Sequence, residues 1–367
     1  MAASNINVAT VQQAIPPIPV PSQWWCRWQA LKGTNPRHLK PPEADLRNKW
    51  VLLTGGNSGI GFEAAAQFVK WGANIVLGCR PQVPPHEMHP DEAIQQLKAA
   101  SIAAGHPKAG IEWWECDMNS LKSVEAFGKR WISMGRPLDI LANNAGIGGP
   151  LVPGEVCYTA DGFEIVHQVN FISHVLLSMM LLPSLAQATQ PRIICTTSCM
   201  QYFGVFDLAN ANSGRNAYPN NKLYFQTWLT ELQARMENHA KYKHIMIQGV
   251  HPGYVKTNIW VAPQSTTSEN TTQQNTRPPK TRFMSWLEWS LRVLLRYYGI
   301  DPQQGSLAIT NAAAAADLAS GSRYTNRIWE EKPMPQTMHP ACRHQVWQFV
   351  SEELLLEDRG LLTELGA

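Results

Sequence analysis

Apolar and polar positions follow two different spacings along residues 46–262, and these spacings predict a regular order of strands and helices. Short apolar runs are typical of buried strands, and the longer segments between them have the three-to-four-residue apolar spacing of helices. The predicted strands are 50–54, 74–79, 111–116, 138–142, 192–197, 245–251 and 324–328. The predicted helices are 62–71, 91–104, 121–134, 162–185 and 219–241. This alternation favours an α/β fold with one doubly wound parallel sheet of about seven strands.

The N-terminal segment has a different composition. Residues 14–42 are rich in proline and tryptophan, which predicts an extended arm that packs its aromatic side chains on the main body. We therefore expect residues 1–45 to form an N-terminal arm and residues 46–262 to form the main domain.

The segment after residue 262 begins with a polar run. Residues 263–282 contain almost no apolar residue, which predicts a flexible surface loop. The acceptor pattern Asn270-Thr271-Thr272 lies there, but no secretory signal precedes it, so we expect no glycosylation. Residues 283–367 are expected to be a helical extension of the same domain that also closes the sheet.

Composition narrows the classes of function. Lys and Arg total 31 and Asp and Glu total 28, so the net charge is +3, which argues against a nucleic-acid binder with a basic face. The seven cysteines are scattered without a Cys-x-x-Cys pair, so we expect no metal site, no disulfide scaffold and a reducing compartment. The N-terminus lacks a secretory pattern and no run of about 18 apolar residues occurs, which favours a cytoplasmic protein, soluble or peripheral to a membrane.

A glycine-rich loop separates the first predicted strand from the first predicted helix. Its candidate cofactor contacts are Gly55, Asn57, Ser58, Gly59, Ile60 and Gly61. Glycines permit a tight turn and a close backbone approach to a pyrophosphate, whose charge is favoured by the N–H groups and dipole at the start of the helix. An ordinary turn is the alternative, but the position between strand and helix favours a Rossmann-type dinucleotide site in residues 46–262.

The end of the second strand indicates which dinucleotide is bound. Folds that prefer NAD(H) usually place an acidic residue there to hydrogen-bond the ribose 2′-hydroxyl, whereas this chain has Arg80. A guanidinium suits a 2′-phosphate, so we expect NADP(H) in preference to NAD(H), with a solvated strand-end arginine as the alternative. Asp117, at the end of the third strand, is a candidate acceptor for the adenine amino group or a helix N-cap.

Tyr218 and Lys222 form the candidate catalytic pair. They are four residues apart, which places them one turn apart on the same helix face. A tyrosine with a pKa near its usual value of about 10 is a poor base at neutral pH, and a nearby ammonium favours the phenolate and lowers that pKa. The pair therefore predicts a tuned general acid/base.

Together the motifs resemble the short-chain dehydrogenase/reductase superfamily over about residues 46–260. The resemblance rests on TGGNSGIG at 54–61, NNAG at 143–146, VNFISH with Asn170, IICTTS with Ser198, Tyr218-x-x-x-Lys222 and HPGYVKT at 251–257. Weaker similarity toward the C-terminus is typical of the retinol-dehydrogenase-like branch, whose members act on lipophilic alcohols and carbonyls.

The resemblance implies a role for each catalytic candidate. Tyr218 would exchange the proton with the substrate oxygen, and Lys222 would hold the nicotinamide ribose and lower the Tyr218 pKa. Ser198 would hydrogen-bond the substrate oxygen, and Asn170 would hold a water that links Lys222 to solvent. Further cofactor contacts are implied at Asn144, Ala145, Gly146, Pro252, Gly253, Val255 and Thr257. Asn144 has bracing of the central strand as its alternative role, and for Asn143 a structural role is at least as well supported.

The expected function is NADP(H)-dependent hydride transfer between nicotinamide and a lipophilic alcohol, ketone or aldehyde. The pattern is also similar to small tailoring dehydrogenases of fungal secondary metabolism. The alternatives are a cofactor-retaining enzyme with a non-redox reaction, such as a cyclisation or isomerisation, and a nucleotide-sensing interaction protein without turnover. Ser198, Tyr218 and Lys222 disfavour both alternatives, because neither has a chemical need for all three.

Other polar and sulfur-containing residues have a simpler interpretation. His167, His174 and His251 lack paired ligands, so we interpret each as a core or edge histidine. Cys195 and Cys199 flank the catalytic serine and are expected to be buried thiols that fill space.

Residues 283–299 have a strongly amphipathic helical pattern, with Trp286 and Trp289 on the apolar part. We expect this helix to cap the substrate pocket as a lid, and its alternatives are contact with a membrane surface and a homodimer surface. The helix carries only two arginines and one glutamate, which give little attraction to anionic lipid and favour the lid.

Overall fold

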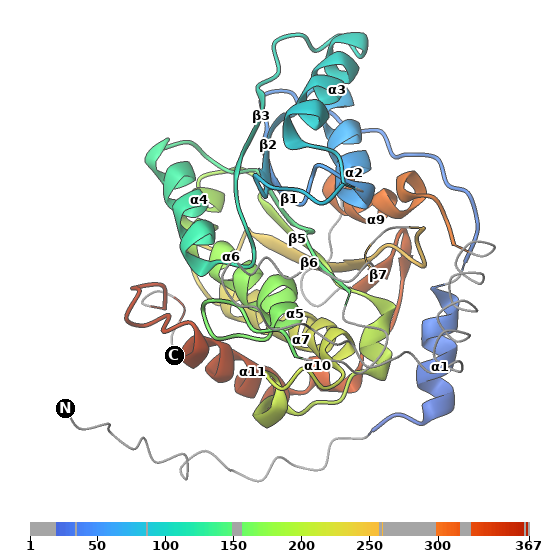
Figure 1. The fold of residues 1–367 in the computed structure, drawn as a ribbon, viewed down its shortest axis with the longest axis vertical. Helices are drawn as coiled ribbons and strands as arrows, with labels where there is room; N and C mark the ends of the chain where they lie inside the picture. The colour runs from blue at the N-terminus through green and yellow to red at the C-terminus, as the bar shows by residue number, and fades with distance from the viewer. Residues whose placement is uncertain are drawn as a thin grey trace, which may run out of the picture.

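The structure is a computed structural model that describes residues 20–33, 35–85, 87–148, 156–256, 259, 299–315, 324–362 and 365. Within these residues, eight strands form one sheet in the order β3-β2-β1-β4-β5-β6-β7-β8 (Figure 1). Their bounds are β1 (Trp50–Thr54), β2 (Asn74–Cys79), β3 (Ile111–Glu115), β4 (Ile140–Asn143), β5 (Arg192–Thr196), β6 (Met246–His251), β7 (Tyr324–Asn326) and β8 (Trp329–Glu330). The first seven strands pair in parallel and β8 pairs antiparallel with β7. The predicted α/β fold with a doubly wound sheet is confirmed.

Helices cover both faces of this sheet. On one face α2 (Gly59–Lys70) packs against α3 (Pro90–Ala103) and α9 (Pro302–Ala314), and the three share one apolar cluster with the strands. On the other face α4 (Leu121–Ser133), α6 (Ser173–Leu185), α7 (Ala217–Glu237) and α11 (Pro340–Glu353) share a second cluster. The remaining helical segments are α1 (Gln23–Lys32), α5 (Ile165–His167), η2 (Gln168–Ile172), η3 (Cys199–Phe203), η4 (Leu208–Asn210) and α10 (Pro335–Met338).

The helix predicted over 162–185 contains a change of winding. It consists of α5, then the π-helical turn η2, then α6. By length and composition Ile165–Leu185 could cross a membrane, but 94% of its most apolar window is buried inside the fold. Its apolar character therefore matches that of a core helix. Single π-helical turns such as η2 are frequent at functional sites.

The seventh predicted strand, 324–328, is shorter than expected. Arg327 has a φ of 54°, which turns the chain after Asn326 into β8 and adds an eighth strand to the seven predicted. Arg327 is buried, and its guanidinium donates to the carbonyl oxygens of Arg37 at 2.8 Å and Asn35 at 2.6 Å. This turn therefore fastens the N-terminal arm to the end of the sheet.

The N-terminal arm is not extended throughout, because residues 23–32 form helix α1. Trp25 packs edge-on against Tyr202 of η3 with ring centroids 5.6 Å apart, so the expected packing of an aromatic ring on the main body is present. Trp24 and Trp28 are 78% and 60% exposed. The predicted loop 263–282 and nearly all of the predicted lid 283–299 lie outside the described residues, and their roles stay predictions.

Candidate active site

The glycine-rich loop connects β1 to α2 with the backbone geometry that only glycine tolerates well. Gly55 and Gly59 have φ values of 65° and 53°. A Cβ atom on Gly61 would lie 2.1 Å from the Gly55 carbonyl oxygen, so no side chain fits there. Ser58 is the N-cap residue of α2, and Ile60 lies in its first turn. The loop therefore presents the start of a helix at the carboxyl edge of β1, as expected for a pyrophosphate site.

Arg80 lies directly after β2, next to the loop that connects β2 to α3. Its guanidinium forms an ion pair with Glu87 of this loop at 3.0 Å. The same loop reaches the glycine-rich loop, because the Asn57 side chain donates to the Met88 carbonyl at 2.8 Å. Glu87 is the residue that sequence reasoning missed here, since a contact across a proline-rich loop has no local signal.

Asp117 forms a turn between β3 and α4. Its carboxylate accepts a hydrogen bond from the Asn119 backbone N–H at 2.9 Å, and the N-cap residue of α4 is Ser120. The N-cap alternative for Asp117 is therefore wrong. The expected contact with adenine stays a prediction.

Asn143 is the last residue of β4, Asn144, Ala145 and Gly146 follow it, and both asparagines brace the sheet. Asn144 donates from its side chain to the Thr54 carbonyl at 3.1 Å and from its backbone to the Thr54 hydroxyl at 2.9 Å. Asn143 donates to Ser178 at 2.8 Å. Both thus have the structural role named as their alternative: Asn144 joins the ends of β1 and β4, and Asn143 joins β4 to α6.

Asn170 lies in the π-helical turn, where its amide is held from both sides. Its Oδ1 accepts from the Ile147 backbone N–H and its Nδ2 donates to the Ile147 carbonyl, both at 2.8 Å. A Cβ atom on Gly146 would lie 3.2 Å from the same Oδ1, so the glycine permits this approach. The turn after β4 and the π-helical turn therefore form one rigid unit.

Ser198 and Tyr218 meet at the carboxyl edge of the sheet. Ser198 follows β5, Tyr218 lies in the first turn of α7, and the Ser198 side chain lies close enough to Tyr218 to lower its pKa by hydrogen bonding. Burial raises the Tyr218 pKa to about 12, and the bond with Ser198 opposes this increase. Two side chains 20 residues apart in sequence are thus brought together where a substrate oxygen could contact both.

Lys222 lies one turn after Tyr218 on α7. Its ammonium donates to the Thr196 carbonyl at 2.8 Å and lies 5.5 Å from the centroid of the Tyr218 ring. Burial lowers the Lys222 pKa to about 8. The expected lowering of the Tyr218 pKa by Lys222 does not appear, because burial disfavours the phenolate and Lys222 is not among the groups that shift this pKa.

The turn after β6 closes the site on the side of the N-terminal arm. Gly253 has a φ of 84°, and a Cβ atom on it would lie 3.0 Å from the Gly33 carbonyl oxygen. Pro252 precedes this turn, and Val255 forms a bridge with Ile300. Thr257 lies outside the described residues.

The three histidines interpreted as core or edge residues and the two cysteines expected to be buried thiols are all buried. Burial lowers the His174 pKa to about 3, and its Nε2 lies 2.8 Å from the Ala145 carbonyl oxygen. Burial raises the pKa of the Cys195 and Cys199 thiols to about 12, so both stay protonated at neutral pH. His167 and His251 each contact a glutamate, Glu353 and Glu331.

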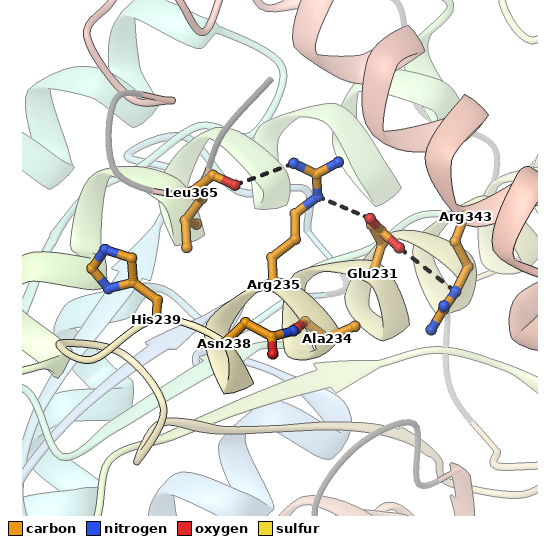
Figure 2. A pocket seen from close by; sticks show the side chains of 7 residues that line it. All are labelled: Glu231, Ala234, Arg235, Asn238, His239, Arg343 and Leu365. Carbon is orange, nitrogen blue, oxygen red and sulfur yellow. Dashed lines mark hydrogen bonds and ion pairs between the residues drawn. The ribbon is translucent and has the colours of Figure 1, made fainter.

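A hollow of about 470 Å³ lies on α7 away from these residues (Figure 2). It is lined by Glu231, Ala234, Arg235, Asn238, His239, Arg343 and Leu365. Its charged groups bind one another, since Arg235 pairs with Glu231 at 2.9 Å and Arg343 lies 3.6 Å from the same carboxylate. None of the candidate catalytic residues lines it, so it is separate from the candidate active site.

Comparison with known families decides the class of this protein. The sequence matches the family described as short chain dehydrogenase over residues 49–267. The chain belongs to this family. This short-chain dehydrogenase is 27% identical to retinol dehydrogenase 14 of Mus musculus over 323 residues, covering 84% of this chain and 86% of the relative. It is 28% identical to polyprenol dehydrogenase of Mus musculus over 331 residues, covering 86% of each. The chain is thus an oxidoreductase of a family that acts on CH–OH or C=O groups, and the resemblance stated from its motifs is confirmed.

Solved structures share the fold. A protein from Mycobacterium paratuberculosis with no known function has a TM-score of 0.58 at 21% identity, over 89% of this chain and 98% of its own. A short chain dehydrogenase from Burkholderia cenocepacia, solved in complex with NADP, has a TM-score of 0.53 at 19% identity, over 77% and 97%. At this level of identity the comparison supports the Rossmann-type fold.

Proposed function

We propose that this short-chain dehydrogenase transfers hydride between NADP(H) and a lipophilic alcohol, ketone or aldehyde, with Tyr218 as the general acid/base. The observation that carries the proposal is that the Ser198 side chain lies within hydrogen-bonding reach of Tyr218, with Lys222 one turn further along α7. Buried Tyr218 and Lys222, with the partly exposed Ser198 beside Tyr218 at the carboxyl edge of a parallel sheet, suit proton transfer to a carbonyl oxygen.

The residues at the ends of β1 and β2 fit a dinucleotide. The glycine-rich loop leaves room for a close backbone approach, because a Cβ atom on Gly61 would collide with the Gly55 carbonyl. Arg80 directly follows β2, where its guanidinium would bind the 2′-phosphate of NADP(H). Lys222 would hold the nicotinamide ribose, and the nicotinamide supplies or accepts the hydride when it is bound.

The mechanism follows from the protonation states of this chain's own residues. In the direction of reduction, the raised pKa of Tyr218 keeps its hydroxyl protonated, so it can donate to the carbonyl oxygen as hydride reaches the carbonyl carbon. Ser198 donates a hydrogen bond to the same oxygen and stabilises its developing negative charge. In the direction of oxidation, Tyr218 must first lose its own proton, and the phenolate then accepts the alcohol proton as the hydride leaves, so the raised pKa of Tyr218 makes this direction depend on high pH.

The class of substrate is supported by two relatives. Both are named for dehydrogenation of long apolar alcohols, retinol and polyprenol, and each match covers more than four fifths of both chains. The experiment is a series of initial rates for ketones and aldehydes of increasing apolar length, with NADPH and with NADH. We expect kcat/KM to rise with apolar length and to be higher with NADPH. No oxidation of either cofactor with any carbonyl of the series would overturn the proposal.

A further inference from the structure

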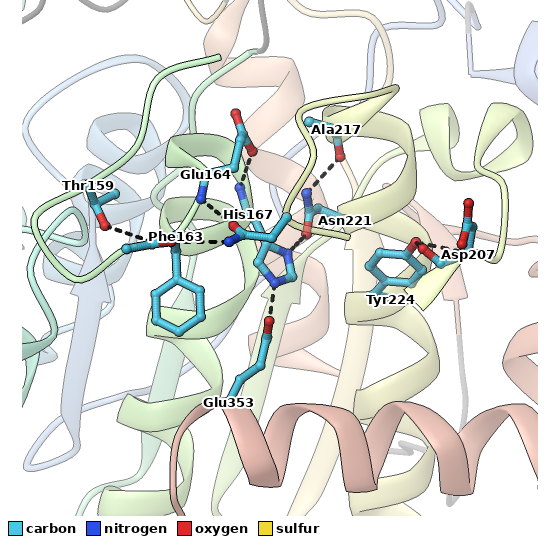
Figure 3. Close-up of polar contacts among 11 residues, drawn as sticks. Thr159, Phe163, Glu164, His167, Asp207, Ala217, Asn221, Tyr224 and Glu353 are labelled. Atoms are coloured by element: carbon cyan, nitrogen blue, oxygen red, sulfur yellow. Dashed lines mark hydrogen bonds and ion pairs between the residues drawn. The ribbon is translucent and has the colours of Figure 1, made fainter. Parts of the chain in front are cut away.

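A buried imidazole lies beside the proposed active site and joins three helices. His167, at the end of α5, is fully buried. Its Nδ1 lies 2.5 Å from Oδ1 of Asn221 on α7, and its Nε2 lies 3.0 Å from Oε2 of Glu353 at the end of α11. Figure 3 shows this chain of contacts, in which His167 lies between the catalytic helix and the C-terminal helix.

The direction of the Asn221 amide determines where the protons are. Its Nδ2 donates to the Ala217 carbonyl at 2.8 Å, so its Oδ1 is the atom that faces His167, and this oxygen can only accept. Nδ1 of His167 must therefore carry a proton. Nε2 faces a carboxylate, so a second proton lies between His167 and Glu353, and the contact is charge-assisted.

Packing alone does not account for a histidine at this position. The rings of Phe163, Phe171 and Phe349 surround it at centroid distances of 6.1, 5.8 and 6.1 Å. A phenylalanine would fill such a space without a polar atom to desolvate, whereas a buried polar group costs stability unless it is hydrogen-bonded. Both ring nitrogens of His167 have a partner, so these two polar contacts are what distinguishes His167 from a phenylalanine at the same position.

The contacts lead directly to the proposed catalytic residues. Ala217, whose carbonyl Asn221 holds, precedes Tyr218, and Asn221 itself precedes Lys222. The N-cap residue of α7, Asn216, has a φ of 50° and makes no side-chain capping bond. Its Nδ2 instead donates to the Phe203 carbonyl at 2.9 Å, so the Asn221 amide is a second hold on the first turn of α7, on the side of α5 and α11. His167 also lies three residues before Asn170 and leads into the π-helical turn.

We propose that His167 is a positioning residue for the reaction assigned above, and that its bond to Glu353 lets helix α11 hold the first turn of α7. The inference rests on the proposed role of Tyr218. The bond to Glu353 fixes the imidazole, the imidazole fixes the Asn221 amide, and the amide fixes the turn that carries Tyr218. A shift of this turn changes the distance between Tyr218 and the substrate oxygen while leaving the glycine-rich loop in place.

The test compares variants of the full-length protein by kcat, KM and the dissociation constant for NADPH. For His167→Phe we expect kcat to fall by about ten- to a hundredfold, because misplacement of a reacting group by about 1 Å can cost this much, with KM and NADPH affinity nearly unchanged. Glu353→Leu should lose kcat similarly. Glu353→Gln should restore it, because a carboxamide N–H can donate to Nε2 of a neutral His167 that still donates to Asn221.

Phe349→Leu is the matched control, because it disturbs the same surroundings and leaves every hydrogen bond of His167 intact. It should lower the melting temperature and leave kcat unchanged. Wild-type kcat in both His167→Phe and Glu353→Leu would overturn the inference and make His167 a packing residue. If His167→Phe does not fold, the comparison of Glu353→Leu with Glu353→Gln decides alone, since Glu353 is 17% exposed and tolerates change better. Turnover that survives in Tyr218→Phe would contradict the proposed function instead.

Discussion

Nη2 of Arg80 donates to both carboxylate oxygens of Glu87, at 3.0 and 3.1 Å. This contact occupies one of the three guanidinium nitrogens of Arg80. It also places the negative charge of Glu87 beside Arg80, the residue proposed to bind a 2′-phosphate. A phosphate brought to this position would be attracted by Arg80 and repelled by Glu87. The balance between these two residues should therefore set the preference for NADPH over NADH.

Arg80→Ala should weaken NADPH binding by about ten- to a hundredfold, because a hydrogen bond to a charged group contributes about 1.5–3 kcal/mol. NADH binding should change little. Glu87→Gln is the matched variant, which removes the competing charge and should tighten NADPH binding without affecting NADH. Titration of wild type and of both variants with each cofactor, followed by protein fluorescence, gives the six affinities. Equal weakening of NADPH and NADH in Arg80→Ala would contradict the assignment of this residue to the 2′-phosphate.

Tyr218→Phe should abolish most turnover and leave the cofactor bound. Loss of a positioned general acid/base costs about 10²–10⁴-fold in rate. Tyr224→Phe on the same helix is the control, because its hydroxyl donates to the Asp207 carbonyl at 2.9 Å and its loss should reduce stability more than rate. Steady-state rates and NADPH affinity for the two variants separate the roles. A Tyr218→Phe enzyme as fast as Tyr224→Phe would mean that another group donates the proton.

The fold pattern and the glycine-rich loop could be predicted because their signals are local. Each βαβ unit is formed by one continuous stretch of the sequence, and the glycines lie where the chain turns from β1 into α2. The features that the sequence did not reveal depend on residues far apart. Glu353 lies 186 positions from His167, and the turn at Arg327 fastens an arm 290 positions earlier in the chain.

The pKa of Tyr218 is the clearest case of a property that spacing alone predicts wrongly. The four-residue separation correctly places Lys222 one turn from Tyr218, which suggested a lowered pKa. The direction of the shift in the Tyr218 pKa is set by burial, which is a tertiary property. The π-helical turn at Asn170 is of the same kind, since the Ile147 backbone that holds the amide belongs to a different element.

Lys222 should make stability depend on pH. Its pKa falls from 10.5 in the unfolded chain to about 8 in the fold, so between these values the unfolded state binds more protons and the contribution of Lys222 to stability rises with pH. Below about pH 8 the full cost of the buried ammonium is present. Lys222→Met should therefore be more stable than wild type at pH 7, by about 3 kcal/mol before the lost Thr196 bond is counted.

Urea denaturation between about pH 7 and pH 9.5 checks this difference. The stability advantage of Lys222→Met should shrink as the pH rises through 8. The readout is the difference in free energy of unfolding between Lys222→Met and wild type at each pH. The buried thiols have raised pKa values and destabilise both proteins at higher pH, so their effect cancels in this difference. Lys98→Met, on the exposed side of α3, should show no such trend. A pH-independent difference for Lys222→Met would contradict the lowered pKa.

Arg327 should control the attachment of the N-terminal arm. Arg327→Met removes the donors to the partly exposed Asn35 and Arg37 carbonyls and should reduce the free energy of unfolding by about 2–4 kcal/mol, since a hydrogen bond from a charged donor contributes about 1.5–3 kcal/mol. A protease of broad specificity should then cut the arm faster. Arg37→Ala keeps the backbone carbonyl and should behave like wild type in both assays. Equal rates of cleavage in Arg327→Met and Arg37→Ala would show that other contacts hold the arm.

The most direct test of the proposed reaction follows the hydride itself. NADPH with deuterium at the transferred position of nicotinamide C4 is mixed with the protein and with the lipophilic ketone or aldehyde that gives the highest rate. The mass of the product and the position of its deuterium are then determined by mass spectrometry. We expect one deuterium on the carbinol carbon of the alcohol formed, with Tyr218→Phe forming at least a hundredfold less product in the same time. An alcohol formed without deuterium, or a product that is an isomer of the carbonyl compound, would contradict hydride transfer at this site.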